Sequence, residues 1–271
     1  MTVFDSSDFR AVALDVDGTL TDHTHQVRPR AIRAIRWLES RGIPVIILTG
    51  RRSNLVLDLA RECGIARPMV SDNGSVILDT GTGEIIEQRF APPELRDAAF
   101  ELADRFGLGR AVWTPDGIYS ERLDHYTEIL GEMAGESVQV GDLHSLPTDR
   151  IYKLNLYGSK ERLDEVQPYI EAHHPAVRRS AVVFFETATP GATKWEGLLH
   201  CLAHLGIDSA QTVGIADGEN DLDFIEGVGL GVAVANAYPR LKDVADIEIG
   251  PADEDGTAIF LEEFFGRHAT A

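Results

Sequence analysis

The sequence predicts an α/β protein with a Rossmann-like parallel-sheet core and a second, α+β domain inserted into that core. Two observations lead to this fold class. In the first and last parts of the chain, short apolar runs alternate with amphipathic stretches, which is typical of a parallel sheet covered by helices on both faces. Between these parts the alternation is replaced by separate strand candidates and one amphipathic helix. The predicted domains are a core over residues 1–90 and 189–271 and an inserted domain over residues 91–188.

The N-terminal part alternates buried strands and helices. Uninterrupted apolar runs predict strands, and apolar residues at helical spacing, such as Ile32, Ile35 and Leu38, predict helices. A Thr-Gly-Thr-Gly turn at 80–83 predicts a hairpin. The predicted elements are strand 11–16, helix 29–41, strand 44–48, helix 52–63, strand 68–71 and hairpin strands 75–79 and 84–90.

Pro92 and Pro93 introduce the inserted segment. Its predicted elements are strands 111–114, 150–157 and 181–186 and helix 160–173. The alternating pattern then returns, which indicates that the insertion splits one parallel sheet. The predicted elements of this last part are helix 194–205, strands 212–216 and 230–234, and two terminal helices near Tyr238 and Ala258.

The composition is strongly acidic and argues against several kinds of partner. Lys and Arg number 25 against 44 Asp and Glu, so the formal net charge is -19 and the basic surface expected of a nucleic-acid binder is absent. No apolar run approaches the roughly 18 residues of a membrane helix, and Cys63 and Cys201 are too far apart for a C-x-x-C motif. We expect a cytoplasmic protein with no nucleic-acid or membrane partner. An anionic substrate would need a local positive field.

Two carboxylates stand where the first predicted strand ends, in Asp15-Val16-Asp17-Gly18. Side chains two positions apart on an extended backbone point the same way, so Asp15 and Asp17 can approach one ligand together. In open α/β sheets ligands bind outside the carboxyl ends of the strands. The alternative is a turn in which both aspartates cap the next segment.

Two further segments carry groups suited to an oxyanion. Thr49-Gly50-Arg51 follows a buried strand and precedes a helix, so a hydroxyl, free amides and a guanidinium are available to a phosphate. Lys194 stands at a helix start where the chain returns from the insertion. For Thr49-Gly50-Arg51 the alternative is an ordinary helix cap followed by solvated arginines. For Lys194 the alternative is a solvated surface lysine.

A second acidic segment, Asp217-Gly218-Glu219-Asn220-Asp221, directly follows an apolar strand. Its carboxylates and carboxamide are oxygen ligands of the kind that Mg²⁺ takes, although an acidic helix cap would have the same composition. All four segments lie at one predicted edge of the sheet. If the aspartates converge, each like-charge pair at ~4 Å costs about 4 kcal/mol at an effective dielectric of 20. Such a cluster needs a divalent cation.

These four segments, in this order, resemble the motifs of the haloacid dehalogenase superfamily of aspartate-nucleophile phosphatases, whose first motif is D-x-D-G-[TV]. The position of the insertion between the second and third motifs resembles the Cof-type branch, which carries its cap domain there. Three further segments are also similar to that branch, namely Ser71-Asp72-Asn73-Gly74-Ser75, Gly231-Val232-Ala233-Val234-Ala235-Asn236-Ala237 and Asp255-Gly256-Thr257-Ala258.

The resemblance implies a haloacid dehalogenase core with a substrate-specificity cap and a Mg²⁺-dependent phosphatase that works on a small phosphorylated metabolite, such as a sugar phosphate. Asp15 would be the nucleophile that forms an aspartyl-phosphate, and Asp17 the general acid and base. The implied catalytic residues are Asp15, Asp17 and Lys194. The implied substrate-binding residues are Thr49, Gly50, Arg51, Lys194 and Asn220. The implied metal-binding residues are Asp15, Asp17, Asp217 and Asp221.

Two other functions fit the same residues. A sugar-phosphate mutase of the superfamily would hand the phosphoryl group to a second hydroxyl instead of to water. A non-catalytic protein could bind phosphate and Mg²⁺ without turnover, although binding alone does not require Asp17. The expected assembly is a monomer or a homodimer.

Overall fold

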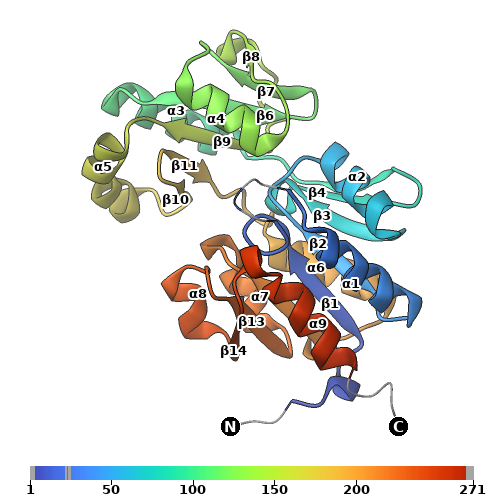
Figure 1. Cartoon of the computed structure of the whole chain (residues 1–271). Helices are drawn as coiled ribbons and strands as arrows, with labels where there is room; N and C mark the ends of the chain where they lie inside the picture. The colour runs from blue at the N-terminus through green and yellow to red at the C-terminus, as the bar shows by residue number, and fades with distance from the viewer. Residues whose placement is uncertain (1–3, 22, 24–25, 267–271) are drawn as a thin grey trace. The chain divides into compact units, whose positions relative to one another are not determined.

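The computed structural model describes residues 4–21, 23 and 26–266 of the 271-residue chain. The chain folds into two compact units (Figure 1). The first unit contains the chain up to Glu87 and from Lys194 onward, and the second contains residues Gln88–Thr193. Among the described residues, no helix combines the length and the apolar character required to cross a bilayer.

The first unit is built on a sheet that has eight strands within the described residues, in the order β14-β13-β12-β1-β2-β3-β4-β5. The strands from β14 to β3 pair in parallel, and β4 runs antiparallel to β3. The strands are β1 (Ala11–Asp15), β2 (Val45–Leu48), β3 (Pro68–Ser71), β4 (Val76–Asp79), β5 (Ile85–Gln88), β12 (Thr212–Ala216), β13 (Leu230–Val234) and β14 (Ile247–Ile249).

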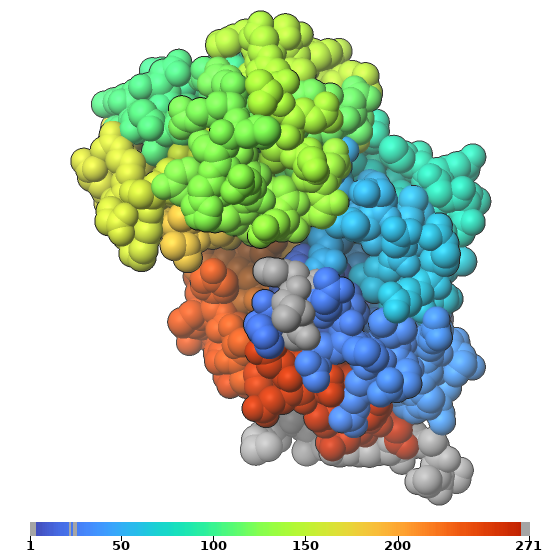
Figure 2. All heavy atoms as spheres, turned by 45° about the horizontal axis from the view of Figure 1, so that its top comes forward, coloured from blue at the N-terminus to red at the C-terminus, as the bar shows by residue number. Residues whose placement is uncertain are grey.

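Helices cover this sheet, and they explain why its central strands β1, β2, β12 and β13 are buried along their whole length. Helix α1 packs against α2 and α9, and α6 packs on β2 and β3 and against α7. As a result α1 and α9, from opposite ends of the chain, lie side by side (Figures 1 and 2). The helices are α1 (Pro29–Ser40), α2 (Ser53–Cys63), α6 (Lys194–Leu205), α7 (Leu222–Gly227), α8 (Pro239–Val244) and α9 (Gly256–Gly266).

The strand register brings the ends of distant segments to one edge of the sheet. Asp15, the last residue of β1, pairs with Leu48, the last residue of β2. On the other side of β1, Leu14 pairs with Ile215 of β12, one residue before that strand ends. Because these strands are parallel, the polar residues that follow each of them emerge at the same edge.

The second unit is an α+β sheet domain with the strand order β10-β11-β9-β6-β7-β8. One face of its sheet packs against α3 and α5 through an apolar cluster that includes Val112, Leu154 and Phe185. The elements are α3 (Pro93–Phe106), β6 (Gly109–Thr114), β7 (Gly117–Ser120), α4 (His125–Ala134), β8 (Gln139–Val140), β9 (Lys153–Tyr157), α5 (Lys160–His173), β10 (Val177–Ala181) and β11 (Phe184–Thr187).

The predicted fold class, an α/β protein with a dominant parallel sheet, is confirmed. Several elements have the predicted bounds, among them β3, β12, β13, α5 and α6. The prediction of a single strand over 181–186 is wrong, because the chain turns at Val182 and Val183 between β10 and β11. The β-branched pair resembles strand sequence, although in the structure it forms the turn of a hairpin.

Candidate active site

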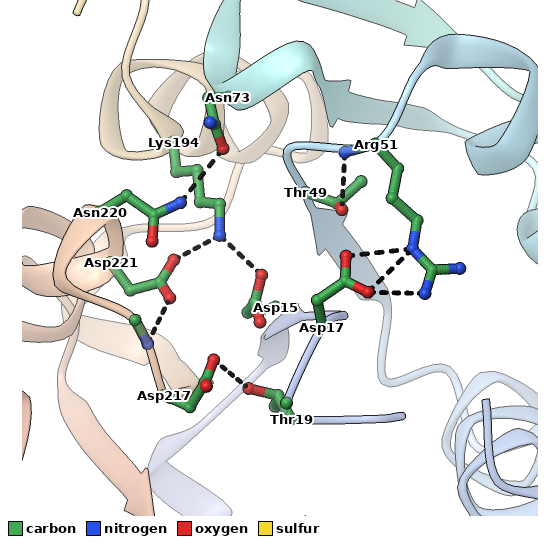
Figure 3. A network of polar contacts seen from close by, with 12 residues as sticks. Asp15, Asp17, Thr19, Thr49, Arg51, Asn73, Lys194, Asp217, Asn220 and Asp221 are labelled. Atoms are coloured by element: carbon green, nitrogen blue, oxygen red, sulfur yellow. Dashed lines mark hydrogen bonds and ion pairs between the residues drawn. The ribbon is translucent and has the colours of Figure 1, made fainter. Parts of the chain in front are cut away.

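Three carboxylates converge at the edge of the sheet where β1 and β12 end. One oxygen atom from each of Asp15, Asp217 and Asp221 can be chosen so that all three lie within 4.8 Å of one another. Asp15 ends β1, and the other two belong to the loop that follows β12 (Figure 3). Asp15 and Asp221 are buried, whereas Asp217 is partly exposed. Solvent therefore reaches the cluster at Asp217, whereas Asp15 and Asp221 are shielded from it.

Lys194 lies within this cluster. Its Nζ is 2.6 Å from Oδ1 of Asp15 and 2.6 Å from Oδ1 of Asp221 (Figure 3). Lys194 is the first residue of α6 and is only 3% exposed. One ammonium group thus neutralises one of the three negative charges and orients two of the carboxylates.

Burial and mutual repulsion shift the ionisation of these groups. Desolvation, together with the charges of Asp15 and Asp221, raises the pKa of Asp217 to about 8. Desolvation also raises the pKa of Asp221 to about 7, although Lys194 opposes the change. For Lys194, burial by itself would lower the pKa, but the two neighbouring carboxylates raise it above the ordinary value. Without a bound cation the site therefore favours protonated carboxyl groups near neutral pH.

Gly18 allows the loop after β1 to pass close to Asp217. Its backbone has a φ of +78°, and a Cβ atom there would lie 2.2 Å from Oδ2 of Asp217. A larger residue would collide with the carboxylate as well as adopt a backbone conformation that glycine tolerates best. Thr19 follows and donates its hydroxyl to Oδ1 of Asp217 at 3.5 Å.

Asp17 turns away from the three clustered carboxylates and pairs with Arg51. The guanidinium holds both carboxylate oxygens, with Nη2 2.6 Å from Oδ1 and Nε 3.0 Å from Oδ2 (Figure 3). The Asp17 side chain is 41% exposed and that of Arg51 is 16% exposed. The sequence predicted that both residues lie at the site, but it gave no indication that they form an ion pair.

The loop after β2 and the loop after β12 are connected by a pair of amides. Thr49 is buried, and its hydroxyl accepts a hydrogen bond from the backbone N–H of Arg51 at 3.1 Å. Asn220 donates Nδ2 to Oδ1 of Asn73 at 3.2 Å, and Asn73 in turn lies against Gly50 (Figure 3). No role was predicted for Asn73, although it belongs to one of the segments that resemble the Cof-type branch.

Two further hydrogen bonds, both from the C-terminal part of the chain, fix the loop after β1. Asn236, two residues beyond the end of β13, donates Nδ2 to the carbonyl of Gly18 at 2.8 Å, and Thr257 donates its hydroxyl to the carbonyl of Thr19 at 2.8 Å. Both residues belong to segments that the sequence analysis used only for the family resemblance. Both side chains bind backbone carbonyls. Because every residue has such a carbonyl, no sequence pattern predicts these contacts.

The donor set of the cluster suits a hard divalent cation. Its side-chain ligands are carboxylate oxygens, which Mg²⁺, Mn²⁺ and Ca²⁺ prefer, and no thiol or imidazole belongs to this cluster. Three carboxylates and one ammonium leave two negative charges, which a divalent cation would balance. Asp15, Asp217 and Asp221 therefore fit a divalent cation, the kind of metal expected from the sequence.

Comparisons with known proteins show the family of this chain. Residues 12–261 match the family described as haloacid dehalogenase-like hydrolase. The phosphoglycolate phosphatase of Methanothermobacter thermautotrophicus is 26% identical over 95% of this chain and 99% of its own length. That of Methanopyrus kandleri is 28% identical over 93% of this chain and 95% of its own length.

A solved structure shows the same fold. The haloacid dehalogenase-like hydrolase of Bacteroides thetaiotaomicron superposes with a TM-score of 0.82 at 26% identity, covering 95% of this chain and all of that one. The chain belongs to the haloacid dehalogenase-like hydrolases. This family membership and the enzyme class expected from the four motifs, a phosphatase, are confirmed.

Proposed function

We propose that this protein is a Mg²⁺-dependent phosphatase that hydrolyses a small phosphorylated metabolite through an aspartyl-phosphate on Asp15. The observation that carries the proposal is the position of Asp15, which contacts Lys194 at 2.6 Å and shares the acidic cluster with Asp217 and Asp221. A carboxylate held in this way by a lysine is oriented for attack, and the charge that remains in the cluster calls for a cation.

In the first step, an Oδ atom of Asp15 attacks phosphorus and the bond between phosphorus and the leaving oxygen breaks. Once Arg51 binds the phosphate in place of Asp17, Asp17 takes up a proton from solvent and donates it to that oxygen, so the product leaves as a neutral alcohol. The exposed side chain of Asp17 is accessible to a bound substrate, whereas Asp15 is buried. This difference in exposure supports the assignment of Asp15 as nucleophile and Asp17 as acid.

In the second step, Asp17 takes a proton from a water molecule, whose oxygen attacks phosphorus. The bond between phosphorus and the Asp15 oxygen breaks. Inorganic phosphate is released, and the free carboxylate of Asp15 is restored. Lys194 balances negative charge on Asp15 during both steps, and the hydroxyl of Thr49 and the amide of Gly50 hold phosphate oxygens. Arg51 and Asn220 complete the phosphate site.

The proposed metal-binding residues are Asp15, Asp217 and Asp221, together with the backbone carbonyl of Asp17. When bound, Mg²⁺ supplies charge neutralisation for the phosphoryl group as it is transferred. The carboxyl groups that bind it must be ionised, so metal binding competes with protons at Asp217 and Asp221, whose pKa values are raised.

We propose that the substrate is a phosphomonoester of the size of a sugar phosphate or phosphoglycolate, and that the second unit selects the leaving group. Two relatives carry the name phosphoglycolate phosphatase, which supports a small phosphorylated acid or sugar. A strongly acidic chain has little overall attraction for a large polyanion, which also favours a small substrate.

A substrate screen tests this proposal. The purified chain with Mg²⁺ is incubated with about a hundred phosphorylated metabolites and with an aryl phosphate, and released inorganic phosphate is measured. We expect phosphate release from a few small phosphomonoesters and none from the Asp15→Asn variant. Formation of an isomeric phosphate ester without free phosphate would identify a mutase instead, and binding without any conversion would identify a non-catalytic protein.

A further inference from the structure

The turn after β3 has an uncommon backbone. Asp72 and Asn73 are consecutive non-glycine residues with left-handed conformations, at φ values of 49° and 55°. Such conformations cost free energy for side chains other than glycine, and they concentrate at functional sites where the surrounding structure compensates for them. This turn lies beside Thr49–Arg51, the segment that would bind phosphate. The proposed mechanism assigns no role to the turn.

Backbone groups of the turn hold the loop after β2. The N–H of Asp72 donates to the carbonyl of Arg51 at 3.0 Å, and the N–H of Asn73 donates to the carbonyl of Thr49 at 3.0 Å. Both carbonyls belong to the segment that would bind phosphate, Thr49–Arg51. The left-handed turn is therefore one of the structures that fix this segment.

The side chain of Asn73 extends this support to the loop after β12. Its Oδ1 accepts the hydrogen bond from Nδ2 of Asn220 at 3.2 Å. The same amide packs so closely on Gly50 that a Cβ atom at Gly50 would lie 3.0 Å from Oδ1 and 3.2 Å from Nδ2. One side chain thus bonds Asn220 (Figure 3) and packs on Gly50, so it reaches both loops that supply the proposed phosphate ligands.

We infer that Asn73 is a positioning residue, which fixes the Asn220 amide relative to the Thr49–Arg51 segment and so sets the width of the phosphate site. This inference rests on the proposed function, because it concerns the same phosphate site. Asparagine meets both demands of the position: it tolerates the left-handed backbone better than most residues, and its amide supplies an acceptor. Glycine would keep the backbone and lose the acceptor, whereas alanine would lose both.

Three variants separate these contributions: Asn73→Gly, Asn220→Ala and the double variant. For the full chain with Mg²⁺, we measure kcat and KM with an aryl phosphate and, independently of turnover, the Kd of inorganic phosphate by calorimetry. In Asn73→Gly both KM and the phosphate Kd should rise about three- to tenfold, the usual effect of one lost side-chain hydrogen bond. Its kcat should stay within about twofold, because the acid and the nucleophile are untouched.

The double variant tests whether Asn73 acts through Asn220. If it does, the double variant should be no weaker in phosphate binding than Asn220→Ala alone. The Asn73→Ala variant is the matched control for backbone strain, and it should melt at a lower temperature than Asn73→Gly because alanine disfavours the left-handed region.

Several results would overturn the inference. The first is an unchanged phosphate Kd in Asn73→Gly. The second is a fall in kcat alone in that variant, which partial misfolding would cause. The third is a loss of phosphate affinity in the double variant that equals the sum of the two single losses. If the parent binds phosphate but releases none from any ester, the proposed function fails, and the binding series still decides the role of Asn73. If the parent neither turns over esters nor binds phosphate, both proposals are wrong.

Discussion

The substitution Asp217→Asn tests the electrostatics of the acidic cluster, because it removes one negative charge with almost no change in volume. Charged carboxylate oxygens no more than 4.8 Å apart repel each other by at least about 3.5 kcal/mol at an effective dielectric of about 20. Lys194 compensates Asp15 and Asp221, which it contacts directly. Ionised Asp217 should therefore destabilise the metal-free protein by a few kcal/mol.

The size of this effect depends on pH. Burial and the neighbouring carboxylates raise the pKa of Asp217 to about 8 in the folded protein, above its ordinary value of 3.8. The folded state then binds a proton more tightly than the unfolded state, so the free energy of unfolding falls as the pH rises from about 4 through about 8. The penalty is absent below about pH 4, where Asp217 is protonated in both states; it is partial at pH 5 and fully present at pH 9.

Melting temperatures of the metal-free parent and the variant provide the assay. At pH 9, Asp217→Asn should melt about 5–10 °C above the parent, since 1 kcal/mol corresponds to about 2–4 °C for a protein of this size. At pH 5 the difference should be much smaller, because the penalty is then only partly developed. Mg²⁺ should stabilise the parent strongly at pH 9 and the variant weakly, because the variant lacks one carboxylate ligand.

The control is Asp223→Asn, which removes a charge from an exposed side chain on α7. It should change neither the metal-free melting temperature nor the response to Mg²⁺ by more than about 1 °C, a normal result for a surface substitution. A variant at position 217 that melts below the parent at pH 9 without metal, or that keeps the full Mg²⁺ response, would refute the electrostatic reasoning.

Three other predictions follow from the same site. In Asp17→Asn, kcat should fall about 10²–10⁴-fold for alkyl phosphates and much less for aryl phosphates, whose leaving groups need no proton; equal losses on both substrates would exclude the acid role. Lys194→Ala should cost about 3–5 kcal/mol of stability in urea unfolding, because it leaves buried carboxylates without their counter-charge; a loss below about 1 kcal/mol would contradict the assignment. Chelation with EDTA should stop phosphate release and added Mg²⁺ should restore it, so continued turnover in EDTA would exclude a metal requirement.

The sequence was sufficient to predict the core elements that place the nucleophile. The first strand and α6 are marked by strongly apolar patterns, so the positions of Asp15 at a strand end and Lys194 at a helix start could be predicted without coordinates. Parallel strands then required their polar ends to meet at one edge. The convergence of Asp15, Asp217 and Asp221 is a consequence of that topology.

The pairing between side chains could not be predicted in the same way. Asp17 and Arg51 are 34 positions apart. The sequence does not indicate whether their side chains face solvent, the substrate or each other. The contact of Asn73 with Asn220 depends on a left-handed turn, for which the Asn-Gly sequence gives only a weak indication. Such contacts depend on how the loops pack against one another. Local sequence patterns predict mainly the helices and strands that the loops connect.

The second unit was predicted less completely, because its elements are short and their patterns are weak. The sequence analysis did not identify α3 or α4, although α4 begins at a capping box in which the side chains of Asp124 and Thr127 bond each other's backbone. The strand β7 lies between polar turns and is four residues long, too short for periodicity to distinguish it from a loop.

The most direct test of the account is to trap the phosphoryl group on Asp15. Protein mixed with a radiolabelled substrate and Mg²⁺ is quenched in acid during turnover, and the labelled peptide is identified by mass spectrometry. We expect a hydroxylamine-labile phosphoryl group on the peptide that contains Asp15, absent from Asp15→Asn and longer-lived in Asp17→Asn. A label on another residue, or full turnover by Asp15→Asn, would contradict the central claim.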